Sequence, residues 1–78
     1  MITVYVIKSL KKKFRYVGIT NDFEKRLLRH NGGLNKSTKA YAPYMVVYRE
    51  EYSSYSAARV REKFLKSGVG RKSLDELT

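Results

Sequence analysis

The sequence predicts an α+β domain with a three-stranded, mainly antiparallel sheet flanked by helices, in the order β-β-α-β-α-α. Two short runs rich in β-branched and aromatic residues, 3–7 and 14–19, are separated by a polar stretch and predict a hairpin. A third such run, 44–51, lies between two segments with the apolar spacing of helices. The 78 residues are predicted to form a single domain, 1–78.

The first two strands carry one candidate tyrosine each, and their pairing register decides whether the two side chains meet. Three consecutive lysines, 11–13, are too polar to bury and are predicted to form the hairpin tip. Side chains alternate between the faces of a strand, so Tyr5 and Tyr16 share a face only if Tyr5 pairs with an even-numbered residue, such as Tyr16 or Gly18. The sequence leaves this register open.

The first helix is expected to follow Asn21, a good capping residue, with Glu24 three residues later as in a capping box. Asn31 and the two glycines after it are a strong stop signal. The apolar stripe of this helix is predicted to contain Phe23, Leu27 and Leu28.

A polar, basic loop, 35–41, then leads through Pro43 to the third strand, 44–51. The central apolar run of that strand is typical of an interior position in a sheet. The lysines at the hairpin tip and the loop at 35–39 (Asn35 to Lys39, with Ser37) are each as well explained by phosphate contact as by simple solvation.

A second helix is expected over 55–67, capped by Ser53 or Ser54 and ended by Gly68. Its apolar side is predicted from spacing to contain Ala57, Val60 and Phe64, with Ala58 and Leu65 beside them. A short last helix over 70–77 would pack Leu74 and Leu77.

Charge gives the first indication of function. Seventeen Lys and Arg residues against seven Asp and Glu residues leave a formal net charge of +10. Such a field favours a polyanion, and nucleic acid is preferred over a membrane surface because the basic residues are spread over every predicted element.

The absence of cysteine excludes disulfides, zinc knuckles and thiol nucleophiles. With no signal-peptide pattern or apolar run of membrane-spanning length, a soluble, cytoplasmic domain is expected.

Four short motifs then resemble a known family in order and spacing: Thr3-Val4-Tyr5, Tyr16-Val17-Gly18, the segment 26–31, and Arg61-Glu62-Lys63. Together they resemble the GIY-YIG nuclease superfamily. The chain is similar in particular to its small single-domain bacterial members and to the nuclease domain of the excision-repair endonuclease. Thr3 stands where the first motif of the family has glycine, and no asparagine follows Asn35.

The resemblance implies a metal-dependent endonuclease that hydrolyses phosphodiester bonds of DNA, with branched or flapped forms among the candidate substrates. It implies five site residues: Tyr5, Tyr16, Arg26, His30 and Glu62. Tyr16 corresponds to the general base, Arg26 to the catalytic arginine, and Glu62 to the single glutamate that binds Mg²⁺ or Mn²⁺. Tyr5 and His30 would orient groups or transfer protons.

These residue types also suit the chemistry without the family. Arg26 and His30 are four residues apart and therefore neighbours on a helix. An arginine can bridge two phosphate oxygens with a permanent charge. Glu62 lies at the border of the apolar face of its helix, where its carboxylate could point inward, and Mg²⁺ often takes only one or two protein ligands.

Each assignment has a structural alternative. Either tyrosine alone could be packing, Arg26 could be solvated or pair with Asp22, and His30 could cap a helix end. Glu62 could pair with Arg59 or Lys66 on an exposed face.

Two other functions remain open. One is a non-catalytic nucleic-acid-binding module with the same fold. The other is a basic protein–protein adaptor that uses an aromatic surface formed by Tyr41, Tyr44, Tyr48, Tyr52 and Tyr55.

Overall fold

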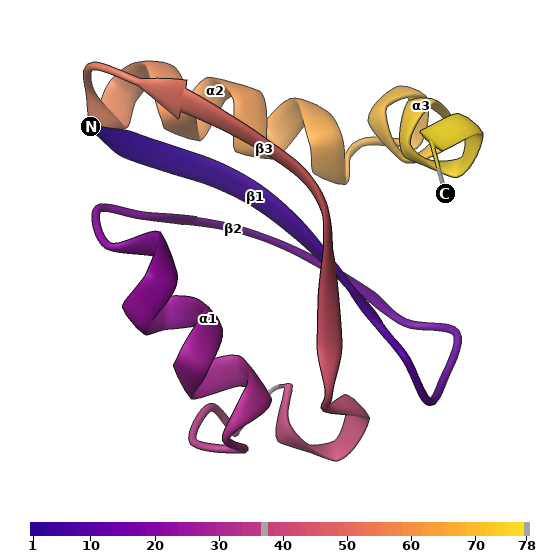
Figure 1. Ribbon diagram of the computed structural model, residues 1–78. Coiled ribbons are helices and arrows are strands. Elements are labelled where there is room, and N and C mark those ends of the chain that lie inside the picture. Colours follow the sequence, from indigo (N-terminus) through magenta and orange to yellow (C-terminus); the bar gives the residue numbers. More distant parts are fainter. Residues whose placement is uncertain (37, 78) are drawn as a thin grey trace.

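The computed structural model describes residues 1–36 and 38–77, which form three strands and three α-helices (Figure 1). Their order along the chain is β1 (Ile2–Ser9), β2 (Arg15–Thr20), α1 (Phe23–Asn31), β3 (Tyr44–Tyr52), α2 (Tyr55–Lys66) and α3 (Gly68–Leu77), with a short 3₁₀ turn, η1 (Lys39–Tyr41), before β3. The sheet is antiparallel throughout, with strand order β2-β1-β3. The predicted α+β class and element order are confirmed.

The register of the β1–β2 hairpin places both candidate tyrosines on one face of the sheet. Tyr5 pairs with Gly18, and Ile7 pairs with Tyr16. Tyr5 and Tyr16 therefore lie on neighbouring strands, diagonal to each other on the same side. The three lysines at 11–13 are exposed at the hairpin tip, as predicted.

The sheet separates two hydrophobic clusters, one under each layer of helices (Figure 1). On one face, Tyr5 and Ile7 pack with Phe23 of α1 and with Tyr44. The alternate residues of β1, Ile2, Val4 and Val6, pack on the other face of the sheet against α2 and α3. This second cluster also contains Val17, Ala58, Leu65 and Leu74. β1 is covered on both faces because it is apolar at successive positions, which is typical of a central strand.

The prediction that the strand at 44–51 is interior was wrong. β3 forms an edge of the sheet, and β1 occupies the centre. The middle of β3 is apolar, but Arg49 and Glu51 in its second half are exposed to solvent. A strand with charges on one face suits an edge better than a centre buried on both sides.

The helix caps differ from prediction at one end. The N-cap of α1 is Asp22, not Asn21, and its side chain accepts a hydrogen bond from the Lys25 backbone N–H (3.2 Å). The expected capping box with Glu24 does not form because the cap lies one residue later. Ser54 caps α2 as predicted, accepting from the Ala57 N–H.

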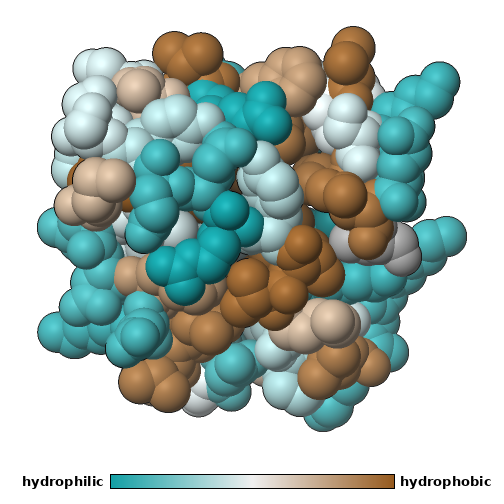
Figure 2. Space-filling model, turned by 45° about the horizontal axis from the view of Figure 1, so that its top comes forward, coloured by the Kyte–Doolittle hydropathy of each residue, from teal (hydrophilic) through white to brown (hydrophobic). Residues whose placement is uncertain are grey.

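Apolar spacing misjudged part of the buried face of all three helices. Leu28 is 72% exposed and lies outside the α1 core, and Leu77 of α3 is 62% exposed. In α2 the buried positions are Ala58 and Leu65, whereas Val60 is 71% exposed. Figure 2 shows hydrophobic and hydrophilic side chains interspersed over the face it presents.

The rotation of α2 brings Glu62 toward the sheet, because Glu62 lies between the buried Ala58 and Leu65 on the helix surface. Gly70, in the first turn of α3, allows α3 to pack closely against the end of α2, since a Cβ there would lie 2.0 Å from the Phe64 carbonyl oxygen. None of the described helices is both long and apolar enough to cross a lipid bilayer.

Candidate active site

The centre of the candidate site is the hydroxyl of Tyr5, which reaches from the middle strand across to β2. Tyr5 is fully buried, and its ring packs against Phe23 at a centroid distance of 5.4 Å. The hydroxyl lies over Gly18, where a Cβ would be only 2.6 Å from the Tyr5 oxygen and 3.0 Å from a ring carbon of Tyr16. The glycine of the second motif therefore makes room for both tyrosines.

His30 joins Tyr5 to the loop that follows α1. The Tyr5 hydroxyl lies 3.0 Å from His30 Nε2, and His30 Nδ1 lies 2.8 Å from Thr38 Oγ1. With the His30 proton on Nδ1, Thr38 Oγ1 accepts from Nδ1–H and can donate to the Asn35 carbonyl oxygen (3.5 Å), and Nε2 accepts from the Tyr5 hydroxyl. All three hydroxyl and imidazole groups are fully buried.

This environment sets the protonation of both groups. Burial, with the nearby Tyr16, raises the pKa of Tyr5 to about 12, although Arg26 acts in the opposite direction. Burial, with the charge of Arg26, lowers the pKa of His30 below its usual 6.5. Tyr5 is therefore protonated and His30 neutral at pH 7, as the hydrogen-bond direction requires.

Tyr16 and Arg26 lie next to this pair. The Tyr16 ring is 5.0 Å from the His30 ring and 6.3 Å from the Tyr5 ring, centroid to centroid. Arg26 acts on Tyr5 through both its charge and a hydrogen bond, and its charge also acts on His30. Asp22, the alternative partner of Arg26, uses its side chain to cap α1 instead.

Arg26 also lines an open hollow of about 190 Å³ at the junction of β2 and α1. Two further cations, Lys25 and Arg29, line the same hollow, with Asp22 as the acidic residue among the lining groups. The lining is completed by Thr20 and Asn21. The position gives the guanidinium access to an anion that approaches from solvent.

Glu62 approaches from the other layer of helices. Its side chain is only 13% exposed, and its carboxylate forms ion pairs with Lys66 (3.2 Å) and Arg59 (3.9 Å). Lys66 and Arg59 are the partners expected if Glu62 has only a structural role. That alternative places Glu62 on an exposed face, whereas its side chain is largely buried. Its negative charge raises the pKa of Tyr5, so it acts on the same hydroxyl as Arg26.

Each of the other four predicted residues thus interacts with Tyr5. Tyr5 bonds to His30, and the other three, Tyr16, Arg26 and Glu62, all act electrostatically on the Tyr5 hydroxyl. Because Tyr5 reaches over Gly18 of the outer strand, the arrangement lies at the β2 side of the sheet, between α1 and α2.

Sequence reasoning missed Thr38, the second partner of His30. The sequence predicts a polar segment at 35–39, yet Thr38 is fully buried, and its carbonyl oxygen accepts a hydrogen bond from the Tyr44 hydroxyl (2.7 Å). Asn31 Oδ1 also accepts from the Tyr44 backbone N–H (2.6 Å). A local pattern does not reveal these contacts because they depend on the path of the loop; Ser37 of this segment lies outside the described residues.

The tyrosines proposed as an adaptor surface are mostly engaged within the fold. Tyr44 is buried, and Tyr41 stacks on Phe14 at 4.2 Å. Tyr48 and Tyr52 both donate to Glu50, and these hydrogen bonds lower the pKa of that carboxyl. Tyr55 is the exposed one of the five, and Tyr41, Tyr48 and Tyr52 are half-buried, which is what packing within the fold predicts for this group.

The donor set near Tyr5 contains one carboxylate, that of Glu62, and the hydroxyls of two tyrosines. Among the described residues, no group of three or more His, Cys, Asp and Glu side chains could hold a metal ion. A closed structural metal site is thus not formed by these residues, but the set fits Mg²⁺ or Mn²⁺, which keeps several waters and takes one or two carboxylates with substrate phosphate.

Comparison with known proteins shows the family to which the chain belongs. The family model of the GIY-YIG catalytic domain matches residues 1–74, so the chain belongs to the GIY-YIG domain family. Among curated proteins it is similar to the UPF0213 protein of Staphylococcus saprophyticus, with 36% identity over 91% of this chain and 87% of the relative. The UPF0213 proteins of Clostridium perfringens (38%; 81% and 68%) and Bacillus subtilis (35%; 87% and 69%) are also similar. No solved structure gives a significant match.

Proposed function

We propose that this chain is a metal-dependent endonuclease that hydrolyses phosphodiester bonds of DNA. The observation that carries the proposal is the convergence on the Tyr5 hydroxyl: His30 bonds to it, and Tyr16, Arg26 and Glu62 all influence its ionisation. Membership in the GIY-YIG domain family and the net charge of +10 support a nucleic-acid substrate. Such a substrate would place the protein in the cytoplasm, and DNA repair or recombination would be the processes it serves.

The polar side chains of the candidate site have distinct roles in this proposal. Arg26 binds two oxygens of the scissile phosphate and stabilises the charge that develops there. Tyr16 accepts a proton from the attacking water at its phenolic oxygen. Tyr5 remains protonated because of its high pKa, so it cannot replace Tyr16 as the base. It donates to His30, which passes the hydrogen-bond chain on to Thr38.

Glu62 would hold Mg²⁺ or Mn²⁺, exchanging its ion pair with the half-exposed Lys66 side chain for the metal. A bound ion supplies positive charge at the phosphate and a more acidic water. A site with a single carboxylate can hold such an ion, because Mg²⁺ takes most of its other ligands from water and substrate phosphate.

A non-catalytic nucleic-acid-binding module is the second candidate. The specific observation in its favour is that Glu62 is already neutralised by Lys66 and Arg59. This alternative predicts salt-dependent DNA binding, no products with any divalent metal, and binding that survives Glu62→Gln.

Substitution of Arg26 distinguishes the two candidates. We expect the purified chain with Mg²⁺ or Mn²⁺ to cut labelled flapped, branched, nicked or single-stranded DNA. Arg26→Ala should lower the single-turnover rate by about 10²-fold or more, because a donor to the transition-state charge is lost. Arg26→Lys should recover part of the rate through its charge alone.

The matched control is Lys63→Ala, which removes an exposed positive charge from α2 and should leave the rate close to that of the unaltered chain. Cutting by Arg26→Ala at the rate of Lys63→Ala would show that the activity does not come from this site. Absence of products from the unaltered chain, with binding retained, would favour the non-catalytic module.

A further inference from the structure

Helix α2 is held against the sheet by a narrow line of apolar side chains. Its buried residues are Ala58 and Leu65. At about 100° per residue, these two side chains lie within about 20° of each other around the helix axis. Alanine has a small side chain, so this buried line alone gives the helix little resistance to rolling about its own axis.

A second apolar face of the same helix competes with the buried line. It consists of Ala57, Val60 and Phe64, which apolar spacing predicts to be buried but which are all exposed. The centre of this face lies about 120° from the buried line around the axis. A roll of the helix toward it would bury Val60 and Phe64, which the hydrophobic effect favours. The same roll would turn Glu62 to the side of the helix that faces away from the sheet.

Arg61 and Glu62 lie on opposite flanks of the buried line, each about 50° from it. On one flank, the charge of Glu62 raises the pKa of Tyr5. On the other flank, Arg61 contacts Glu50 and Tyr48 of β3. Because the two residues are adjacent on a rigid helix, the direction in which Arg61 is held determines the direction in which Glu62 points.

Arg61 is held by a polar network on the face of β3 that α2 covers. Tyr48, Glu50 and Tyr52 are alternate residues of β3, and they pair with the residues of β1 that pack under α2. The hydroxyls of Tyr48 and Tyr52 both donate to the Glu50 carboxylate. Arg61 Nε lies 3.3 Å from Glu50 Oε1, and Nη2 donates to the Tyr48 hydroxyl oxygen (3.3 Å). The guanidinium also lies over the Phe64 ring, 5.0 Å from its centroid.

This network opposes the roll. Two tyrosine hydroxyls fix the Glu50 carboxylate, so Arg61 meets a partner that is already oriented. A roll that buried Val60 would carry Arg61 across to the opposite flank of the helix and away from Glu50 and Tyr48. The contacts of Arg61 would all have to break before Glu62 could turn away from the sheet.

We propose that Arg61 is a positioning residue, whose contacts with Glu50 and Tyr48 select the rotation of α2 in which Glu62 approaches the sheet. The use of Glu62 as a metal ligand rests on the proposed nuclease function. The rotation itself does not, and it can be measured without metal or DNA.

Residual dipolar couplings of the α2 backbone amides measure this rotation. In a helix they follow a wave of 3.6 residues whose phase reports the rotation about the axis, and the couplings of the sheet amides fix the alignment. We expect Arg61→Ala to shift the phase toward burial of Val60. Arg61→Lys keeps a charge beside Glu50 without the planar fork and should shift it less. Lys63→Ala, which removes an exposed cation from the same helix, should leave the phase unchanged.

Val60→Gln separates a change of rotation from a general loss of stability. Val60 is exposed, so this substitution alone should leave the phase of the wave unchanged. Combined with Arg61→Ala, it removes the apolar side chain that the roll would bury, and the phase should return toward that of the unaltered chain. A loss of stability without rotation gives no reason for such a rescue.

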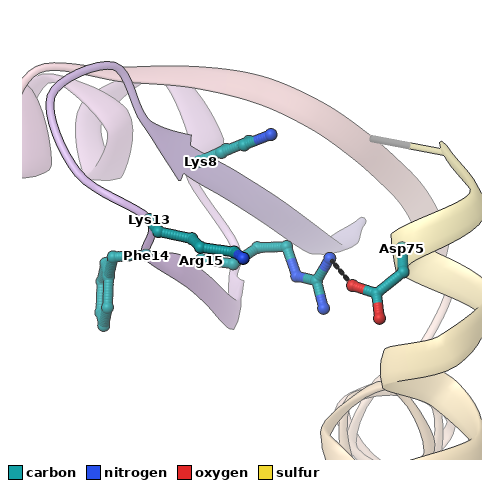
Figure 3. A pocket seen from close by; sticks show the side chains of 5 residues that line it. All are labelled: Lys8, Lys13, Phe14, Arg15 and Asp75. Atoms are coloured by element: carbon teal, nitrogen blue, oxygen red, sulfur yellow. Dashed lines mark hydrogen bonds and ion pairs between the residues drawn. The ribbon is translucent and has the colours of Figure 1, made fainter.

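The carboxylate end of the network has a matched control in another ion pair that joins two elements, Arg15–Asp75 between β2 and α3 (Figure 3). Arg15 Nη1 lies 2.8 Å from Asp75 Oδ1, and Nη2 donates to the Arg71 carbonyl oxygen (3.4 Å), so the two elements stay in contact when the carboxylate is neutralised. Glu50→Gln should shift the phase of α2 in the same direction as Arg61→Ala. Asp75→Asn makes the same charge change and should leave it unchanged.

Metal binding connects the rotation to the proposed function. Arg61→Ala should weaken Mn²⁺ binding by about 10-fold, as loss of a group that supports a metal ligand does. The electron paramagnetic resonance signal of free Mn²⁺ measures this affinity. In a Glu62→Gln background, Arg61→Ala should cause no further loss, because its effect acts through Glu62.

An α2 phase in Arg61→Ala equal to that in Lys63→Ala, or a shifted phase that Val60→Gln does not reverse, would overturn the positioning role. The outcome is separable from that of the nuclease proposal. A shifted phase with Mn²⁺ binding that Glu62→Gln does not weaken contradicts only the metal-dependent nuclease. Mn²⁺ binding that depends on Glu62, with an unshifted phase in Arg61→Ala, contradicts only the positioning role.

Discussion

At the scale of single residues, the candidate site depends on one missing side chain. Gly18 lies directly beneath the Tyr5 hydroxyl and beside the Tyr16 ring, and a methyl group there would overlap both. Packing of this kind cannot be read from the motif alone, because it follows from the register that pairs Tyr5 with Gly18.

Gly18→Ala tests this fit. The added Cβ should displace the Tyr5 ring, lengthen its hydrogen bond to His30 and lower the free energy of unfolding by about 1–3 kcal/mol, as other overpacked positions do. Urea denaturation followed by circular dichroism measures the change. Gly68→Ala is the matched control, since nothing lies within 4 Å of its Cβ position, and it should be neutral or slightly stabilising. Equal stabilities of the two variants would contradict the packing described.

His30 offers a direct view of the site's electrostatics because it is the only histidine in the chain. An NMR titration should give a pKa below 6.5, and Arg26→Ala should raise it, since burial and the Arg26 charge both lower it. The unfolded chain takes up this proton first, so stability should fall as the pH drops from 6.5 toward the folded pKa. A pKa at or above 6.5, unmoved by Arg26→Ala, would place Arg26 away from the imidazole.

At the scale of elements, residues close in sequence predicted which helices and strands form, but not always which face of each one is buried. The hairpin, the Ser54 cap and the stop after α1 follow from residues close in sequence. The position of β3 at an edge and the exposure of Val60 follow from packing between distant segments. The rotation of α2 matters most for function, because it determines that Glu62 rather than Val60 approaches the sheet.

The loop between α1 and β3 shows the same limit. Its polar residues favour a solvated segment, yet Thr38 of this loop contacts His30 and accepts a hydrogen bond from Tyr44 of β3. Asn31 of α1 also bonds directly to the backbone of Tyr44. The side chains that face His30 thus come from all three strands and from this loop. The hydrogen-bond chain through His30 joins Tyr5 of β1 and Thr38 of the loop to the end of α1.

At the scale of the whole molecule, the two layers of helices contribute different parts of one candidate site. α1 provides Arg26 and His30 on one face of the sheet, and α2 provides Glu62 from the other layer. Tyr5 reaches over Gly18 of β2 between them. The sequence predicted the five residues through ordered motifs, but their meeting at an outer strand depends on the complete fold.

The proposed metal position is tested most directly by titrating Mn²⁺ into the chain and following the His30 imidazole signals by NMR. If Glu62 holds the ion beside Tyr5, the paramagnetic Mn²⁺ should broaden the His30 signals at low metal concentration, and Glu62→Gln should abolish the broadening while Glu76→Gln leaves it intact. His30 signals that stay sharp, or that broaden equally in Glu62→Gln, would contradict a single metal-dependent site formed by these five side chains.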